Sequence, residues 1–129
     1  MALVQCIDDE FGIRHVVRLA LERIGLSVAE ASSAQIALTQ FETTVPDLVL
    51  MDLRLPDMPG IQLAQHIREQ YPSVPVIFMS ASTELSQAAE NADVRTYIEK
   101  PFKLAQLQRL IQETIAAHGS SAIGVETTP

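Results

Sequence analysis

The sequence predicts an α/β protein built on a five-stranded parallel sheet with helices on both faces. Short, largely apolar runs recur along the chain, and such runs are typical of strands buried on both faces of a parallel sheet. Between them lie longer segments whose apolar residues recur every three or four positions, the spacing of an amphipathic helix. Alternation of the two patterns is typical of β–α units joined into one parallel sheet.

Five short runs rich in apolar and β-branched residues are the predicted strands. They lie at residues 3–7, 27–29, 48–51, 76–79 and 95–99. Pro46 stands before the third run and Pro75 before the fourth. Because proline interrupts a helix, both residues separate a predicted helix from the strand that follows it.

The predicted helices follow from apolar spacing and from the residues at their ends. They lie at residues 11–24, 34–41, 61–70, 84–91 and 104–118. Gly25 is expected to end the first helix, and Ser32 and Ser33 offer oxygens that can cap the second. The helix at 84–91 is weakly patterned and polar, whereas the last helix has a clear apolar stripe.

The chain is expected to form one domain over residues 1–118. A length of 129 residues is enough to bury a single hydrophobic core. Residues 119–129 are small, polar and unpatterned, and we expect a flexible C-terminal tail or linker there. Whether an effector domain follows Pro129 in the native protein is left open.

The composition argues against nucleic-acid binding and against a membrane span. The formal net charge is -7 and the nine Lys and Arg residues are scattered, whereas nucleic-acid phosphates require clustered basic side chains. No apolar run is long enough to cross a bilayer, and the N-terminus does not resemble a signal peptide. The single cysteine, Cys6, fits a buried, inert thiol in a reducing compartment. We therefore expect a cytoplasmic protein.

Polar side chains stand where four of the predicted strands end. Asp8 and Asp9 follow the first strand, Asp52 the third, Ser80 the fourth and Lys100 the fifth. The carboxyl ends of parallel strands meet at one edge of a sheet, where α/β proteins bind their ligands. The sequence therefore predicts one site that contains three carboxylates, a hydroxyl and an ammonium group.

These groups suit a divalent cation and a phosphoryl group. Mg2+ prefers oxygen ligands, and adjacent acids can bind it directly and through water. A carboxylate can attack phosphorus to give an aspartyl phosphate, with Lys100 neutralising the phosphoryl oxygens and Ser80 donating a hydrogen bond. Each residue taken alone is a weak signal, but their shared position at successive strand ends is a strong one.

Four segments of the chain resemble the receiver domain of two-component response regulators, the CheY-like family. They are CIDDE at 6–10, LMDLRLPDMPG at 50–60, MSA at 79–81 and YIEKPF at 97–102. The resemblance covers roughly residues 3–117, and it implies a doubly wound, flavodoxin-like sheet with strand order 2-1-3-4-5.

The resemblance implies a signalling switch rather than an enzyme, one that at most assists its own phosphorylation and dephosphorylation. Asp52 would accept a phosphoryl group from a histidine kinase or a phosphotransfer protein, and Lys100 would contact that group. The Mg2+ ligands would be Asp8, Asp9, Asp52 and the backbone carbonyl of Arg54. Ser80 would be the switch hydroxyl and Tyr97 the switch aromatic residue.

The implied output is a change in the surface formed by helix 84–91, strand 95–99 and the last helix. A downstream protein or effector domain would read that surface, and a homodimer could form through it. The segment between Ser80 and Lys100 is slightly shorter than is usual in the family, which leaves the length and register of helix 84–91 open.

Two other functions stay open. A Mg2+-dependent phosphatase also forms an aspartyl phosphate, but its nucleophile lies in an early Asp-x-Asp motif and its Asp-Asp pair comes late, the reverse of the order here. A receiver-like domain can also be a phosphorylation-independent interaction module. Turnover of a phosphomonoester would favour the first alternative, and a Mg2+ titration tests the second.

Overall fold

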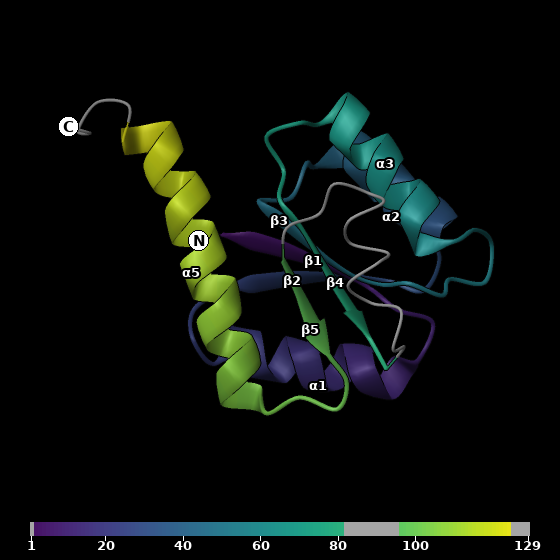
Figure 1. Cartoon of the computed structure of the whole chain (residues 1–129), viewed down its shortest axis with the longest axis horizontal. Helices are drawn as coiled ribbons and strands as arrows, with labels where there is room; N and C mark the ends of the chain where they lie inside the picture. The colour runs from purple at the N-terminus through teal and green to yellow at the C-terminus, as the bar shows by residue number, and fades with distance from the viewer. Residues whose placement is uncertain (1, 82–95, 125–129) are drawn as a thin grey trace.

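The fold is a five-stranded parallel sheet with the strand order β2-β1-β3-β4-β5 (Figure 1). The computed structural model describes residues 2–81 and 96–124, and for residues 119–124 it describes the backbone alone. The strands are β1 (Leu3–Ile7), β2 (Ser27–Ala31), β3 (Leu48–Asp52), β4 (Val76–Ser80) and β5 (Thr96–Glu99). The helices are α1 (Phe11–Glu22), α2 (Ala34–Thr43), α3 (Gly60–Gln70) and α5 (Leu104–Gly124). The predicted fold class and strand order are confirmed.

Helices cover both faces of the sheet, as Figure 1 shows, with α1 and α5 on one face and α2 and α3 on the other. Side chains alternate between the faces along each strand. On β3, Leu48 and Leu50 belong to the core under α1 and α5, whereas Val49 and Met51 belong to the core under α2 and α3. Because both faces are buried, the strands are nearly continuous apolar runs.

The predicted ends of two helices are confirmed. Gly25 adopts φ +87, and its N–H donates to the carbonyl of Glu22 at 3.1 Å while the N–H of Leu26 donates to Leu21 at 3.1 Å. This pair of bonds is the Schellman motif, which requires the left-handed conformation that glycine adopts without steric cost. Ser33 caps α2 by accepting the N–H of Ile36 at 3.2 Å.

The last helix is longer than predicted. It continues through Gly119 to Gly124, and Figure 1 shows its C-terminal end running past the sheet. The expected end at 118 was wrong because a single glycine costs a helix only about 1 kcal/mol, and no proline follows before Pro129. The flexibility of the tail stays a prediction. The predicted helix at 84–91 lies outside the described residues.

Across residues 2–81 and 96–124, no helix combines the length and the apolar character needed to cross a membrane.

Candidate functional site

The candidate site is a pocket of about 270 Å³ at the carboxyl edge of the sheet. Its lining comes from the last residues of β3 and β4 and from residues that follow β1, β3, β4 and β5. These residues are Glu10, Asp52, Arg54, Ser80, Ala81 and Lys100. The topology places the ends of these strands together, as the sequence predicted.

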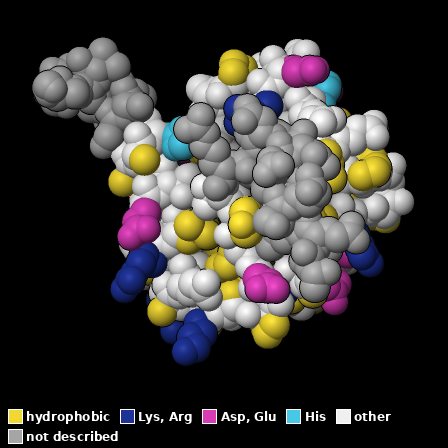
Figure 2. Space-filling view, in the orientation of Figure 1, with side chains coloured by type: hydrophobic (Ala, Val, Ile, Leu, Met, Phe, Trp, Pro, Cys, Tyr) yellow, Lys and Arg dark blue, Asp and Glu magenta, His cyan; other side chains and the backbone are white. Residues whose placement is uncertain are grey.

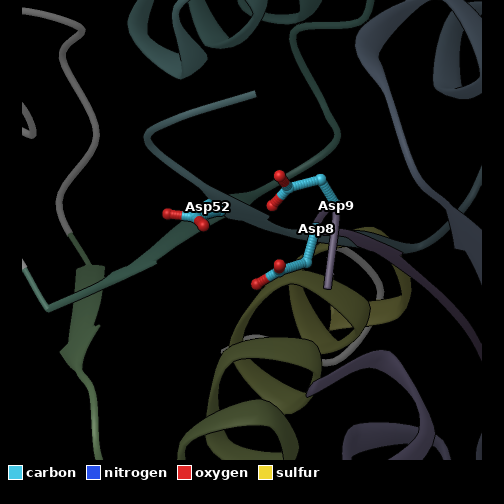
Figure 3. A group of neighbouring side chains, drawn as sticks. All are labelled: Asp8, Asp9 and Asp52. Atoms are coloured by element: carbon cyan, nitrogen blue, oxygen red, sulfur yellow. The ribbon is translucent and has the colours of Figure 1, made fainter. Parts of the chain in front are cut away.

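Three aspartates meet beside this pocket. Figure 3 shows Asp8 and Asp9 at the end of β1 and Asp52 at the end of β3, with their carboxylates close to one another. One carboxylate oxygen of each lies within 4.8 Å of the others. Asp8 is fully buried, Asp52 is 9% exposed and Asp9 is exposed. An all-oxygen donor set with one solvent-facing member fits Mg2+, which binds carboxylates and retains several waters.

Lys100 places a positive charge in contact with the carboxylates of the site. Its Nζ lies 2.8 Å from Asp8 Oδ2, 3.4 Å from Asp52 Oδ2 and 3.9 Å from Glu10 Oε1. The backbone places it there, because the N–H of Lys100 donates to the carbonyl of Ser80 at 2.9 Å. The Lys100–Pro101 peptide bond is cis.

Burial and neighbouring charges shift the pKa values of the central pair. Burial raises the pKa of Asp52, the charge of Asp8 raises it further, and Lys100 opposes both effects only in part. Burial alone would lower the pKa of Lys100, but its hydrogen bonds and charge interactions with Asp8 and Asp52 outweigh burial and raise it. The lysine therefore stays charged, and it is the main compensation for the buried carboxylates in the described site.

The loop after Asp52 depends on Gly60. A Cβ at this position would lie 2.5 Å from the carbonyl oxygen of Asp52 and 2.8 Å from the Cα of Leu53. The N–H of Gly60 donates to the carbonyl of Leu53 at 2.7 Å, and Arg54 pairs with Pro59 in an antiparallel bridge. The sequence indicated Gly60 only as a loop residue. Its close approach to Asp52 and Leu53 was missed, because that contact is visible only in the folded loop.

Asp8 is held by residues that the sequence interpretation did not assign to the site. Its Oδ1 accepts the N–H of Glu10 at 2.9 Å, and its carbonyl accepts Nη1 of Arg14 at 2.6 Å. Glu10 also lines the pocket. Its position directly after the acid pair could have indicated this role. Nothing in the local sequence indicates the contact of Arg14.

The structure places the two predicted switch residues differently. Ser80 is buried at the end of β4 and lines the pocket. Tyr97 is 44% exposed on β5, where it lines a separate groove of about 410 Å³ with residues of α5 that include Arg109 and Glu113. The site therefore brings together Asp8, Asp9, Asp52, Ser80 and Lys100, while Tyr97 lies on the outer surface.

An apolar groove of about 370 Å³ adjoins the site. It is lined by residues of α1, by the residue after β4, by the connection between β5 and α5 and by the first residue of α5, namely Ile13, Val16, Ala81, Lys100, Pro101, Phe102 and Leu104. Val16 and Leu104 are each 43% exposed. Lys100 borders both the groove and the pocket, so the groove leads directly to the charged site.

Basic side chains are dispersed over one face of the molecule. On the face shown in Figure 2, the Lys and Arg side chains of the described residues stand apart and are interspersed with acidic groups. This distribution agrees with the scattered basic residues of the sequence.

Comparison with known proteins agrees with this geometry. The family model of the response regulator receiver domain matches residues 4–112, and the chain therefore belongs to that family. Phosphorylation and Mg2+ binding at an acidic pocket are general features of this family of two-component signalling proteins.

Individual relatives differ in length. The KDP operon transcriptional regulatory protein KdpE of Escherichia coli strain K12 is 38% identical over 123 residues, which cover 94% of this chain and 54% of KdpE. The DNA-binding transcriptional regulator NtrC of Proteus hauseri is 36% identical over 114 residues, which cover 87% of this chain and 24% of NtrC. The chain thus spans about half or a quarter of these curated relatives.

Solved structures show the same fold. A CheY-like receiver domain protein from Methanospirillum hungatei JF-1 superimposes with a TM-score of 0.87 at 28% identity, covering 94% of this chain and 98% of that one. NtrX from Brucella abortus, crystallised with ATP, gives a TM-score of 0.89 at 27% identity, covering 98% of this chain and 29% of NtrX.

Proposed function

We propose that the chain is a phosphorylatable receiver that accepts a phosphoryl group on Asp52 from a histidine kinase or a phosphotransfer protein. The observation that carries the proposal is the setting of Asp52. Its carboxylate lines an open pocket, lies 3.4 Å from the ammonium of Lys100 and stands beside two further carboxylates. This setting combines a nucleophile, a fixed cation and ligands for a metal ion.

The transfer forms one bond and breaks another. A carboxylate oxygen of Asp52 attacks the phosphorus of a phosphohistidine, and the P–N bond breaks as the O–P bond forms. The electron pair of the P–N bond goes to the imidazole nitrogen, which takes a proton from solvent. Lys100 neutralises charge on the phosphoryl oxygens, and Mg2+, when bound, supplies further charge neutralisation. Asp8, Asp9, Asp52 and the Arg54 carbonyl are the proposed Mg2+ ligands.

The proposed switch begins at Lys100 and Ser80. A phosphoryl group on Asp52 offers new acceptors to the Lys100 ammonium, which otherwise contacts Asp8 at 2.8 Å. The Ser80 hydroxyl, on the neighbouring strand, donates to another phosphoryl oxygen. Tyr97 then reorients and changes the surface of β5 and α5 together with the predicted helix at 84–91. Phosphorylation shifts the population of two states of this surface.

The apolar groove supports a protein as the phosphoryl donor. It lies between α1 and the start of α5 and ends at Lys100, so a partner that fills it with apolar side chains can present a phosphohistidine to Asp52. The groove that Tyr97 of β5 lines together with residues of α5 is the proposed surface for a downstream protein, an effector domain or a second copy of the chain.

Acetyl phosphate and Mg2+ test the proposal directly. Mass spectrometry of the intact protein is expected to show one phosphoryl adduct on the wild type and none on Asp52→Asn. Absence of the adduct, or an equal adduct on the variant, would refute the proposal. Sustained turnover of a small phosphomonoester would instead indicate a phosphatase. Failure to bind Mg2+ or beryllofluoride would indicate a phosphorylation-independent interaction module.

A further inference from the structure

Every polar group of Asp8 forms a hydrogen bond. Its N–H donates to the carbonyl of Ala31 at 3.1 Å, which extends the β1–β2 ladder by one residue. Its Oδ1 accepts from Glu10 at 2.9 Å and its Oδ2 from Lys100 at 2.8 Å. The remaining group, the carbonyl oxygen, accepts a hydrogen bond from the Arg14 guanidinium at 2.6 Å.

Arg14 reaches Asp8 from the first turns of α1, where a second contact fixes its guanidinium. Arg14 Nε lies 3.1 Å from Glu30 Oε1 on β2, and the side chain is only 13% exposed. The planar guanidinium allows Nε to face Glu30 while Nη1 faces the Asp8 carbonyl. Hydrogen bonds from Arg18 and Arg14 lower the pKa of Glu30, so its carboxylate stays charged.

We infer that Arg14 is a positioning residue for the cation site, acting through the backbone of Asp8. The inference rests on the proposed use of Asp8 as a Mg2+ ligand. Asp8 lies where β1 ends and the chain turns into α1, so its carbonyl has no further strand residue to pair with on the ladder. The charged hydrogen bond of Arg14 replaces that pairing and fixes the peptide group that carries both Asp8 and the following Asp9.

Arg18 provides a matched control. It binds the same carboxylate, with Nε 2.6 Å from Glu30 Oε2, and it binds Glu22 at 3.0 Å. Both arginines therefore link α1 to β2. Of the two, only Arg14 contacts Asp8 among the described contacts. Removing either arginine removes a positive charge and an ion pair with Glu30, whereas only the change at position 14 releases the Asp8 carbonyl.

Arg14→Ala can affect Mg2+ affinity in two ways, and these two effects have opposite signs. Loss of a nearby positive charge favours binding of a cation to the carboxylates. Loss of positioning disfavours it, and groups that orient metal ligands typically contribute 10–100-fold to affinity. A weaker affinity in Arg14→Ala can therefore be attributed to positioning and not to charge.

Calorimetric Mg2+ titrations of the whole chain test the inference. We expect the dissociation constant to rise roughly tenfold in Arg14→Ala and to stay within about twofold of wild type in Arg18→Ala. Arg14→Lys keeps the charge without the guanidinium geometry and is expected to weaken binding as well. The carbonyl 13C resonance of Asp8 should shift in both Arg14 variants and not in Arg18→Ala.

Urea unfolding of all variants shows whether each is folded under the titration conditions. Equal Mg2+ affinities in Arg14→Lys and wild type, or equal losses in Arg14→Ala and Arg18→Ala, would overturn the positioning role while leaving the proposed function intact. A wild-type chain that binds no Mg2+ would overturn the cation site and this inference together.

Discussion

Substitution of Gly60 by alanine tests how closely the loop after β3 must approach the end of that strand. The added Cβ would lie 2.5 Å from the Asp52 carbonyl oxygen, whereas ordinary contacts of this kind begin near 3.4 Å. The loop would therefore have to move by about 0.9 Å, and all three nearest atoms belong to the backbone, which cannot rotate away. Overpacking of this kind typically costs about 1–3 kcal/mol.

The predicted effect on function follows from the same contact, because the loop that must move carries Arg54 and begins at Asp52. We expect Gly60→Ala to lower the free energy of unfolding by about 1–3 kcal/mol and to slow phosphorylation by acetyl phosphate. Urea unfolding measures the first quantity, and the rate of adduct formation at Asp52 measures the second.

Gly12→Ala is the matched control. Gly12 lies inside α1, and a Cβ there would meet no heavy atom within 4 Å. Because alanine favours a helix over glycine, this variant is expected to gain up to about 1 kcal/mol of stability without a change in phosphorylation. If Gly60→Ala were as stable and as rapidly phosphorylated as wild type, the close approach of Gly60 would not be needed.

Three further predictions concern single side chains. Asp57 accepts the N–H groups of Ala34 and Gln35 at 2.9 and 2.8 Å, so Asp57→Ala is expected to cost about 1 kcal/mol of unfolding free energy in urea titrations. These bonds lower the pKa of Asp57. The ionised Asp57 therefore adds to the free energy of unfolding at neutral pH, and this stabilisation is lost as the pH falls through the lowered pKa. The difference in unfolding free energy between Asp57→Ala and wild type should vanish in acid. Gln5 is buried, and its Nε2 donates to the Ala37 carbonyl at 3.1 Å and to Gln40 Oε1 at 3.0 Å. Gln5→Met leaves both acceptors without this donor, so it is expected to cost about 1 kcal/mol of unfolding free energy in the same assay, and an unchanged stability would contradict this. Lys100→Met removes the ammonium group that lies 2.8 Å from Asp8 Oδ2 and competes with Mg2+ for this carboxylate. The Mg2+ affinity of this variant, measured by calorimetry, should therefore be no weaker than that of wild type, even though its phosphorylation is slower.

The sequence was sufficient to predict the sheet, most of its elements and the residues that meet at its edge. Buried parallel strands are continuous apolar runs, and a polar residue at the end of such a run must lie at the carboxyl edge. That reasoning located Asp52, Ser80 and Lys100 before any distance was known. The ends of helices also depend on local residues. Gly25 was therefore predicted correctly, and Ser33 was one of the two predicted caps of α2.

Contacts between elements far apart in the chain could not be predicted in the same way. Arg14 resembles any other polar residue on the exposed side of a helix until the fold brings β2 beside α1. Gly60 has the sequence context of an ordinary loop glycine. The end of α5 was misplaced for a different reason, because a glycine ends a helix only when the chain leaves the helical path there, and at Gly119 it does not.

The ion pair of Lys100 with Asp8 joins residues 92 positions apart in the chain. Asp8 follows β1 and Lys100 follows β5, and β3 and β4 lie between these two strands in the sheet, so the pair forms only when these four strands are in place. A partly folded chain therefore presents carboxylates without their lysine. Under the proposed function, a chain whose β5 has not joined the sheet would lack the ammonium that neutralises the phosphoryl oxygens on Asp52.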